Sequence, residues 1–229
     1  MRIFVSDLAA GELVVTGDEH HYLARVRRAR VGDAVELVDG AGKRARAQIV
    51  AIGEDTRLSV GAVEDIPDLP PRVRVLLPLI KGDRMDTCIE KLVEVGADEI
   101  VVWPAARAVV KLDGARRASR VEHYQAIARA AARQSGRATT PIVSAVDSLA
   151  AAIATARGAR IVLDPTAERA AFPPHGDDVT IISGPEGGLA PDELEALADF
   201  TRIGLGPRVL RAETAPVIAV ALVRASTDT

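Results

Sequence analysis

Two glycine- and proline-rich stretches hold the residues whose types and spacing could do chemistry. The first, IISGPEGGLAPDELE, covers residues 181–195, and the second, GLGPRVLRAETA, covers residues 204–215. Each follows a short apolar run and precedes a helix-start signal, which is the order strand, loop, helix. In an open α/β sheet, ligands bind where such loops leave the carboxyl ends of the strands. We therefore expect both loops at one edge of one sheet.

The composition of the first loop limits the ligand that it could hold. Gly187 and Gly188 carry no side chain, so backbone N–H and C=O groups can approach a bound molecule closely. The loop lacks the lysine of a GxxxxGK[ST] motif and the GxGxxG pattern, and Glu186 would repel a phosphate. A neutral or cationic ligand with amide edges fits this loop better.

The elements that position these loops follow from an alternation of strand and helix patterns that begins at Val73. This alternation is typical of an α/β fold with a parallel sheet. Strands are expected at residues 73–80, 100–103, 160–163 and 179–182, and helices at about 85–95, 116–135 and 148–156, from 191 and from about 213.

The chain before this region reads as a separate small domain. Short apolar or alternating runs predict strands at residues 2–5, 12–15, 34–38, 45–52 and 58–63. The proline-rich stretch DIPDLPPR, residues 65–72, indicates a stiff linker. We therefore expect one domain over residues 1–68 and a second over residues 72–229.

Gly17–Arg30 is the exception within the first domain, because its pattern predicts a helix with Asp18 as the N-cap. Tyr22, Leu23 and Val26 are expected to pack inward. Arginines 25, 27, 28 and 30 are expected to point outward, where a basic helix could grip RNA.

Composition excludes several classes of protein. A net charge of −3 argues weakly against a general nucleic-acid coat protein, although residues 71–140 hold 13 basic and 8 acidic side chains. Cys88 is the single cysteine, so an internal disulfide and a cysteine-cluster metal site are excluded, and no histidine spacing indicates a metal. No apolar run could span a membrane, and the N-terminus has no signal-peptide layout. We expect a soluble, cytoplasmic protein without a metal.

Several motifs resemble those of a known class of proteins. GPEGGL and LGPRVLRAETA, followed by an apolar C-terminal helix, resemble the signature of the SPOUT class of S-adenosylmethionine-dependent RNA methyltransferases. Within that class the chain resembles the RsmE family, which methylates N3 of a uridine in the 16S rRNA of the small ribosomal subunit. GDEHHYLARVRRAR with GDAVELVDG is similar to the PUA-like domain of that family, and KGDRMDTCIEKLVEVGADEI, ARAVVK and QSGR to its later segments. The resemblance covers nearly the whole chain.

This resemblance implies a fold and partners. The fold would be a small PUA-like β-barrel followed by a parallel sheet with a C-terminal trefoil knot, and the partners would be 16S rRNA in the small ribosomal subunit and a second copy of the chain. The dimer would form through the C-terminal helix, which is apolar on every side over Val217–Val223.

The resemblance also implies which residues form the site. The S-adenosylmethionine contacts would be Leu163, Asp164, Pro165, Ser183, Gly184, Pro185, Glu186, Gly187, Gly188, Leu205, Gly206, Pro207, Leu210, Arg211 and Thr214. The RNA contacts would be Arg25, Arg27, Arg28, Lys81, Arg107, Lys111, Gln134 and Arg137. The family usually places acids just before the QSGR element, whereas Ala130 and Arg133 stand here, so no catalytic acid lies at those positions.

Methylation of uridine N3 needs more than positioning, because the N3 lone pair appears only after a proton leaves. A base, or a cation that stabilises charge on O2 or O4, must assist. Arg211 and Glu213 follow the second loop directly and are the first candidates, with a structural ion pair at the helix start as the alternative reading. Arg107, Lys111, Gln134 and Arg137 are the next candidates.

Two other functions remain open at this stage. One is a SPOUT methyltransferase that acts on tRNA ribose or guanine. The other is a non-catalytic RNA-binding or ribosome-assembly factor that keeps the fold, against which the intact glycine loops argue.

Overall fold

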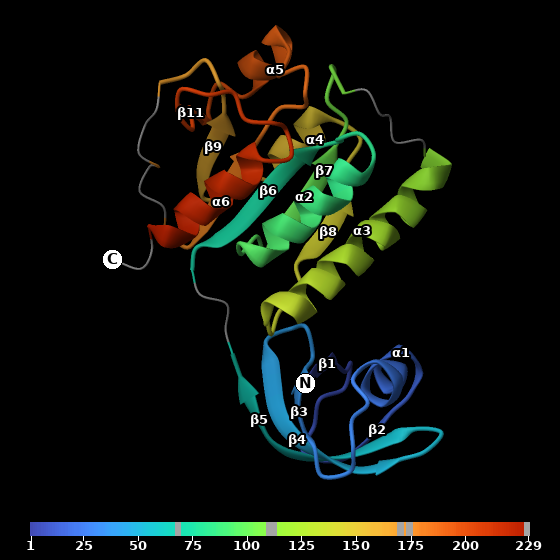
Figure 1. Cartoon of the computed structure of the whole chain (residues 1–229). Helices are drawn as coiled ribbons and strands as arrows, with labels where there is room; N and C mark the ends of the chain where they lie inside the picture. The colour runs from blue at the N-terminus through green and yellow to red at the C-terminus, as the bar shows by residue number, and fades with distance from the viewer. Residues whose placement is uncertain (67–69, 109–113, 169–171, 173–175, 227–229) are drawn as a thin grey trace. The chain divides into compact units, whose positions relative to one another are not determined.

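The chain folds into two compact units, shown in a computed structural model that describes residues 1–66, 70–108, 114–168, 172 and 176–226 (Figure 1). The first unit comprises Met1–Asp68 and Ala132–Thr140, and the second comprises Leu69–Ala131 and Pro141–Thr229.

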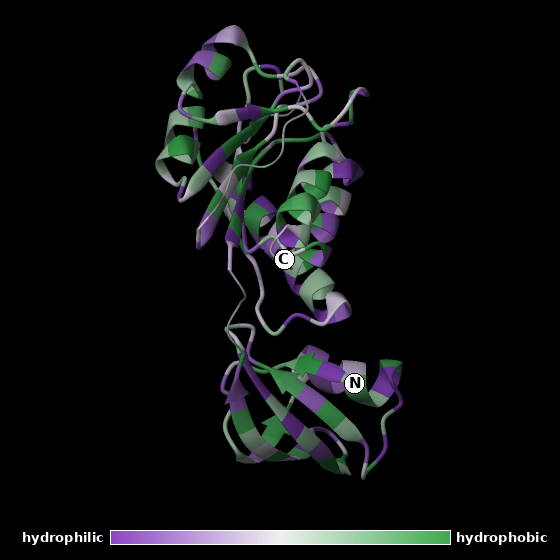
Figure 2. Cartoon of the chain, turned by 90° about the vertical axis from the view of Figure 1, so that its left-hand side faces the viewer, coloured by the Kyte–Doolittle hydropathy of each residue, from purple (hydrophilic) through white to green (hydrophobic). Residues whose placement is uncertain are grey.

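The first unit is built on a five-stranded sheet with the order β1-β3-β4-β5-β2. Its strands, which confirm the five expected runs, are β1 (Arg2–Phe4), β2 (Gly11–Val15), β3 (Ala34–Val38), β4 (Lys43–Ile52) and β5 (Thr56–Asp65). β1 pairs with β3 in parallel, and the other neighbours pair antiparallel. Burial alternates along β4 and β5, as the mixed green and purple of these strands in Figure 2 shows, so one face packs on a core and the other meets solvent.

The core of this unit explains why the alternating runs became strands. Ile3, Leu37, Ile49 and Leu58 are at most 1% exposed, and Leu23 from the helical segment joins them. Burying a side chain of this size stabilises the fold by about 1.5–3 kcal/mol.

The basic segment after β2 is helical but shorter than expected. It consists of α1 (Gly17–His21) and a π-helical turn, η1 (Tyr22–Val26). The residue at the N-cap is Thr16, so the assignment of Asp18 as the cap was wrong.

The π-helical turn also corrects the expected inner face of this segment. Leu23 is fully buried and Tyr22 partly buried, but 61% of Val26 is exposed. The N–H of Arg27 donates to the carbonyl of Tyr22 at 2.8 Å, five residues back. This wider turn carries Val26 off the face that Leu23 occupies.

The segment Ala132–Thr140 joins the first unit although it follows a long stretch of the second in sequence. Thr139 forms β-bridges with Gly40 and Ala41, and the N–H of Thr140 donates to the carbonyl of Gly40 at 2.9 Å. Arg133 forms an ion pair with Glu19. No pattern in the sequence indicated this return of the chain.

The guanidinium of Arg133 also lies over two aromatic rings of the first unit. Its Cζ is 5.7 Å from the ring centre of Phe4 and 5.2 Å from that of Tyr22. Each such contact contributes about 0.5–1 kcal/mol or more when it is desolvated.

The second unit is an α/β domain with a six-stranded, wholly parallel sheet of order β11-β9-β10-β6-β7-β8. The strands are β6 (Arg72–Pro78), β7 (Glu99–Trp103), β8 (Ile142–Ala145), β9 (Ala159–Leu163), β10 (Asp178–Ile182) and β11 (Thr201–Ile203). The expected α/β class and parallel sheet are confirmed. β11 is the short strand expected before the second glycine loop, whereas β8 was not expected, since it has four residues and only one of them is buried.

Helices cover both faces of this sheet, and Figure 1 shows α2, α3 and α6 in front of it and α4 behind. The helices are α2 (Asp83–Glu94), α3 (Gly114–Ser135), α4 (Leu149–Ala154), α5 (Pro191–Ala196) and α6 (Ala215–Ala225). α4 and α5 share a core with Trp103, Val162 and Ile182. Burial on both faces explains why β6, β7 and β10 are predominantly apolar and do not alternate between apolar and polar residues along their whole length.

The C-terminal helix is fastened to the rest of the second unit by Arg224. Its guanidinium donates to the carbonyls of Pro71 and Gly96, each at 2.7 Å, and to Asp98 Oδ2 at 2.6 Å. Asp98, whose side chain is 4% exposed, also accepts the N–H of Val73 at 2.8 Å. The end of α6 is thereby tied to the starts of β6 and β7.

Candidate active site

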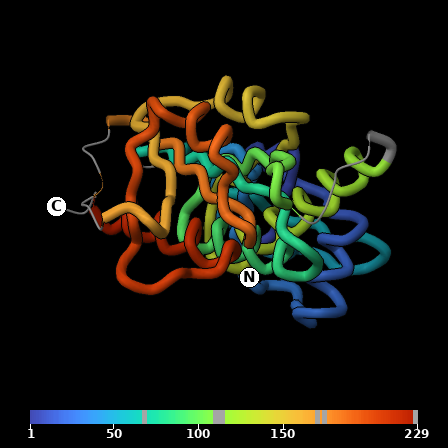
Figure 3. The backbone as a smooth tube through the Cα atoms, turned by 90° about the horizontal axis from the view of Figure 1, so that it is seen from above, coloured from blue at the N-terminus to red at the C-terminus, as the bar shows by residue number. Residues whose placement is uncertain are grey.

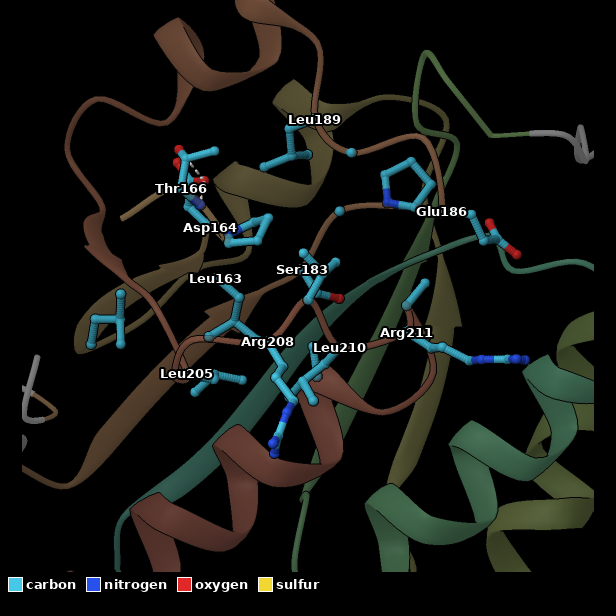
Figure 4. A pocket seen from close by; sticks show the side chains of 18 of the residues that line it. Leu163, Asp164, Thr166, Ser183, Glu186, Leu189, Leu205, Arg208, Leu210 and Arg211 are labelled. Atoms are coloured by element: carbon cyan, nitrogen blue, oxygen red, sulfur yellow. Dashed lines mark hydrogen bonds between the residues drawn. The ribbon is translucent and has the colours of Figure 1, made fainter. Parts of the chain in front are cut away.

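A cavity of about 540 Å³ lies at the carboxyl edge of the parallel sheet (Figure 4). Its walls come from the loops that follow β9, β10 and β11, and Figure 3, which looks down on this edge, shows the orange and red segments side by side. β9, β10 and β11 are adjacent in the sheet, so their loops emerge together. The two glycine loops therefore share one edge, as expected, with the loop after β9 as the third wall.

Most of the residues expected at a cofactor site line this cavity. They are Leu163, Asp164, Pro165, Ser183, Gly184, Pro185, Glu186, Gly188, Leu205, Gly206, Leu210 and Arg211. Gly187, Pro207 and Thr214 lie in the same loops but outside the lining. Arg84, Arg107, Thr166 and Arg208 line it as well and were not among the cofactor contacts expected.

The backbone conformation of the loop after β10 requires glycine at two positions. A Cβ on Gly184 would come within 3.1 Å of the Leu189 backbone nitrogen, and Gly188 has φ of 71°. Both positions therefore favour glycine, and the loop folds back on itself over the cavity.

Ser183 begins this loop with an unusual hydroxyl. Its residue is 2% exposed, it lines the cavity, and its Oγ has no hydrogen-bond partner within the described residues. A buried hydroxyl without a partner costs about 1–3 kcal/mol, which a bound polar group would recover.

The loop after β9 is held by Asp164, which is 5% exposed. Its Oδ1 accepts the N–H and the hydroxyl of Thr166 at 2.8 and 2.7 Å (Figure 4). Its Oδ2 accepts a hydrogen bond from Arg202 Nε at 2.9 Å. Burial by itself raises the pKa of Asp164, but the hydrogen bonds from Thr166 and Arg202 outweigh it and hold this pKa below 3.8. The carboxylate thus shapes the cavity wall.

Arg107 and Glu193 brace the glycine loop from outside. Arg107 Nη1 donates to the carbonyls of Gly187 and Leu189 at 3.2 and 3.4 Å. The buried carboxylate of Glu193 accepts the N–H groups of Ala106 and Ala190, both at 2.7 Å. A glutamate at the third helical position after the loop was the available sequence signal for this role.

Charged side chains gather at one side of the cavity. Arg84 Nη2 lies 3.0 Å from Glu186 Oε1, and Arg84 Nη1 lies 3.9 Å from Glu213 Oε2. Arg211 Nη1 lies 3.9 Å from Glu213 Oε1, and Figure 4 shows Arg211 and Arg208 pointing in different directions from their shared loop. Arg211 and Glu213 are therefore neighbours, and Arg84, which no sequence pattern indicated, lies beside both Glu186 and Glu213.

Glu213 is the least exposed carboxylate of this group, with 16% of its side chain exposed. Its Oε2 is buried and accepts no hydrogen bond from the described part of the chain. Burial raises the pKa of the Cys88 thiol to about 12, and the nearby Glu213 carboxylate adds to the rise. The Glu213 carboxylate is therefore largely out of solvent and close to Cys88, beside the residues that line the cavity and not among them.

The residues expected to bind RNA fall in both units. Arg25, Arg27 and Arg28 are exposed in or just after η1, and Gln134 and Arg137 lie in the returning segment of the first unit. Lys81 is exposed in the second unit between β6 and α2. Lys111 lies outside the described residues.

Two further findings limit the kinds of site. Across the described ranges, no three His, Cys, Asp or Glu side chains gather closely enough to hold a metal ion. None of the helices in those ranges has the length and apolarity needed to cross a membrane.

Comparison with known proteins identifies the family. Residues 67–224 match the model of the RNA methyltransferase domain, and residues 15–58 match that of the RNA methyltransferase PUA domain. Ribosomal RNA small subunit methyltransferase E of Mycobacterium bovis is 37% identical over 92% of this chain and 85% of its own, and that of Bacillus subtilis is 32% identical over 93% and 90%.

A solved structure agrees with these matches. Ribosomal RNA small subunit methyltransferase E from Neisseria gonorrhoeae, bound to S-adenosyl methionine, superposes with a TM-score of 0.88 at 27% identity over 98% of this chain and 97% of its own. The chain therefore belongs to the RNA methyltransferase family and, within it, to the ribosomal RNA small subunit methyltransferase E proteins.

Proposed function

We propose that this enzyme transfers a methyl group from S-adenosylmethionine to N3 of a uridine in the 16S rRNA of the small ribosomal subunit. The observation that carries the proposal is the cavity formed by the loops after β9, β10 and β11. The glycine loops that line this cavity are the ones that resemble the RsmE signature. A relative that superposes on nearly the whole chain is bound to S-adenosyl methionine.

The cavity has the chemistry that this cofactor requires. Its leucine side chains at 163, 189, 205 and 210 offer apolar surface for an adenine ring, and the glycine loops expose backbone N–H and C=O groups for its edges. Ser183 Oγ, buried and without a partner, can donate to or accept from a bound polar group. When bound, the cofactor supplies a methyl carbon that the N3 lone pair takes while the carbon–sulfur electron pair stays on sulfur.

Glu213 and Arg211 assist the removal of the proton from uridine N3. The Glu213 carboxylate, poorly solvated and without a hydrogen bond at Oε2, takes the N3 proton. Arg211, 77% exposed at the cavity mouth, stabilises the charge that then develops on a uracil oxygen. A general base contributes on the order of 10²- to 10⁴-fold to the rate.

RNA is bound by basic residues of both units. Arg25, Arg27 and Arg28 of the first unit are exposed and neutralise phosphates, as do Lys81 and Lys111. Gln134 and Arg137 offer hydrogen bonds from the returning segment of the same unit. Arg107 contributes its charge while it braces the glycine loop.

The proposal includes four further properties of the protein. The chain forms a homodimer through α6, whose Ile218 and Leu222 stand one helical turn apart and are 40% and 45% exposed. The C-terminal segment forms the trefoil knot, which the close approach of Gly204 to the Ala167 carbonyl supports. The strands of the first unit form the PUA-like barrel, and the enzyme works in the cytoplasm.

Calorimetric titration with S-adenosylmethionine, followed by incubation with unmodified small ribosomal subunits and mapping of the methyl group, tests the proposal. Binding and an N3-methyluridine are expected. A methyl group on ribose or guanine would establish a different SPOUT methyltransferase, and no cofactor binding would indicate a non-catalytic RNA-binding relative.

Two variants separate the roles of the residues. Arg211→Ala should abolish transfer while cofactor affinity stays within about threefold, and unchanged turnover would contradict its role. The triple variant Arg25→Ala, Arg27→Ala, Arg28→Ala should weaken rRNA binding and lower its salt dependence by up to about three units of slope. Arg57→Ala, an exposed arginine on β5, is the matched control.

A further inference from the structure

Arg84 occupies a position that is unfavourable for a cation. It is in the first turn of α2, where the unpaired N–H groups of the helix carry partial positive charge, which Asp83 and Asp86 of the same turn offset in part. Arg84 lines the cavity, and a cation at a helix N-terminus needs a partner of opposite charge. Residues that are unfavourable for their local structure are concentrated at functional sites.

Two carboxylates from different loops provide that compensation. Glu186 belongs to the loop after β10 and lies 3.0 Å from Arg84, whereas Glu213 lies before α6 and is 3.9 Å away. One guanidinium therefore connects the two glycine-containing loops that enclose the cavity. Arginine suits this role because its rigid fork can address two carboxylates at once.

The surroundings of Glu213 make Arg84 the dominant charge near its buried oxygen. Arg84 is 40% exposed and faces Oε2, while Arg211 is 77% exposed and faces the other oxygen, Oε1. Solvent screens the more exposed pair more strongly. Cys88, one turn further along α2, is buried and its raised pKa keeps the thiol uncharged, so it brings no competing charge.

We propose that Arg84 is a positioning residue for methyl transfer, which holds the Glu213 carboxylate in place from α2 and is itself held by Glu186. The inference rests on the proposed function of Glu213 as the proton acceptor. In that step the N3–H electron pair stays on N3 and the proton forms an O–H bond with Glu213. Arg84 fixes the direction from which the carboxylate meets that proton.

The test combines turnover with a binding measurement that needs no turnover. The variants are Arg84→Ala, Arg84→Lys, Glu213→Gln and the double variant Arg84→Ala with Glu213→Gln. Lys91→Ala is the matched control, since Lys91 is a basic residue of the same helix that pairs with Glu90 and Glu94 away from the cavity.

Arg84→Ala should lower kcat about tenfold or more at saturating cofactor, with less than about threefold change in the KM for RNA. Arg84→Lys should recover part of the loss. The double variant should be no slower than Glu213→Gln alone, because Arg84 acts through Glu213. Wild-type kcat in Arg84→Ala, or losses that multiply in the double variant, would overturn the proposal.

The binding measurement is the ratio of the affinities for S-adenosylmethionine and S-adenosylhomocysteine, which differ by one positive charge. Removal of Arg84 takes away the cation that pairs with Glu186 and leaves Glu213 with only the more exposed Arg211 among the described cations. This ratio should therefore shift about threefold toward the cationic ligand, and Lys91→Ala should not shift it. If the wild type binds both ligands but transfers no methyl group, the proposed function fails, and an unchanged ratio in Arg84→Ala separately refutes the role of Arg84.

Discussion

Buried polar side chains at and around the cavity differ in whether other groups of the protein form hydrogen bonds with them. Asp164 and Glu193 are buried carboxylates whose oxygens are occupied by groups of the protein. Ser183 Oγ and Glu213 Oε2 are buried oxygens with no hydrogen bond from the described residues. The first pair therefore holds the loops around the cavity in place. Ser183 Oγ lines the cavity and is available to a bound molecule, whereas Glu213 lies beside the lining residues Arg211 and Ala212.

Ser183→Ala should weaken S-adenosylmethionine binding about two- to tenfold, because one hydrogen bond contributes about 0.5–1.5 kcal/mol. The unfolding temperature should not fall, since the removed hydroxyl has no partner in the protein. Calorimetry and thermal unfolding measure the two effects. Ser148→Ala is the contrasting variant, because it loses the N-cap of α4 and should lower stability by about 1 kcal/mol without changing affinity.

Asp164→Asn should destabilise the protein by about 1 kcal/mol at neutral pH, after allowing for Arg202, half of whose side chain is exposed. The folded-state pKa of Asp164 lies below its unfolded value, so the ionised form stabilises the fold above about pH 4. That stabilisation is lost as the pH falls through the folded-state pKa. The difference between the unfolding temperatures of the two proteins should therefore shrink as the pH falls below about 4, and a difference that stays the same from neutral pH to the lowest pH at which both proteins fold would contradict this account.

At the scale of elements, the patterns predicted most strands and helices, because their burial follows directly from residue spacing. β6, β7 and β10 are rich in β-branched and other apolar residues and could be recognised without the structure. η1 could not, because the choice between an α and a π turn depends on how Leu23 and Tyr22 pack. Arg84 was missed for a similar reason, since its partners lie about 100 and 130 residues away in sequence.

The anchoring of α6 yields the prediction at this scale. Arg224→Ala leaves Asp98 buried without its cation and should lower the free energy of unfolding by about 3 kcal/mol, as measured by urea denaturation. Lys91→Ala, which breaks only exposed pairs, should cost less than about 0.5 kcal/mol.

Gly96→Ala should weaken the same anchor from the other side. Gly96 has φ of 106°, and a Cβ there would stand 2.8 Å from Arg224 Nε. Equal stability of Gly96→Ala and the wild type would show that α6 is not held at this point.

At the scale of the whole molecule, we propose that the apolar face of α6 forms the interface of a dimer. Ile218 and Leu222 are exposed on a helix whose opposite face, with Ala219, Val220 and Val223, is buried. We expect a dimer of the 24.1 kDa chain in solution. The double variant Ile218→Glu, Leu222→Glu should sediment as a monomer, whereas Val14→Glu, at an equally exposed apolar site on β2, should not. A monomeric wild type at tens of micromolar would contradict the proposed interface.

The return of Ala132–Thr140 to the first unit has a consequence for synthesis on the ribosome. The N-terminal unit lacks its Thr139 bridges and its Arg133 side chain until residue 140 has left the exit tunnel. At about 5–20 residues per second, the strands of this unit wait roughly 4–14 s for their last segment after residue 68 has been made. During that interval the aromatic rings of Phe4 and Tyr22 lack the cation that lies over them in the finished protein, so we expect the N-terminal unit to reach its full stability only after this segment has emerged.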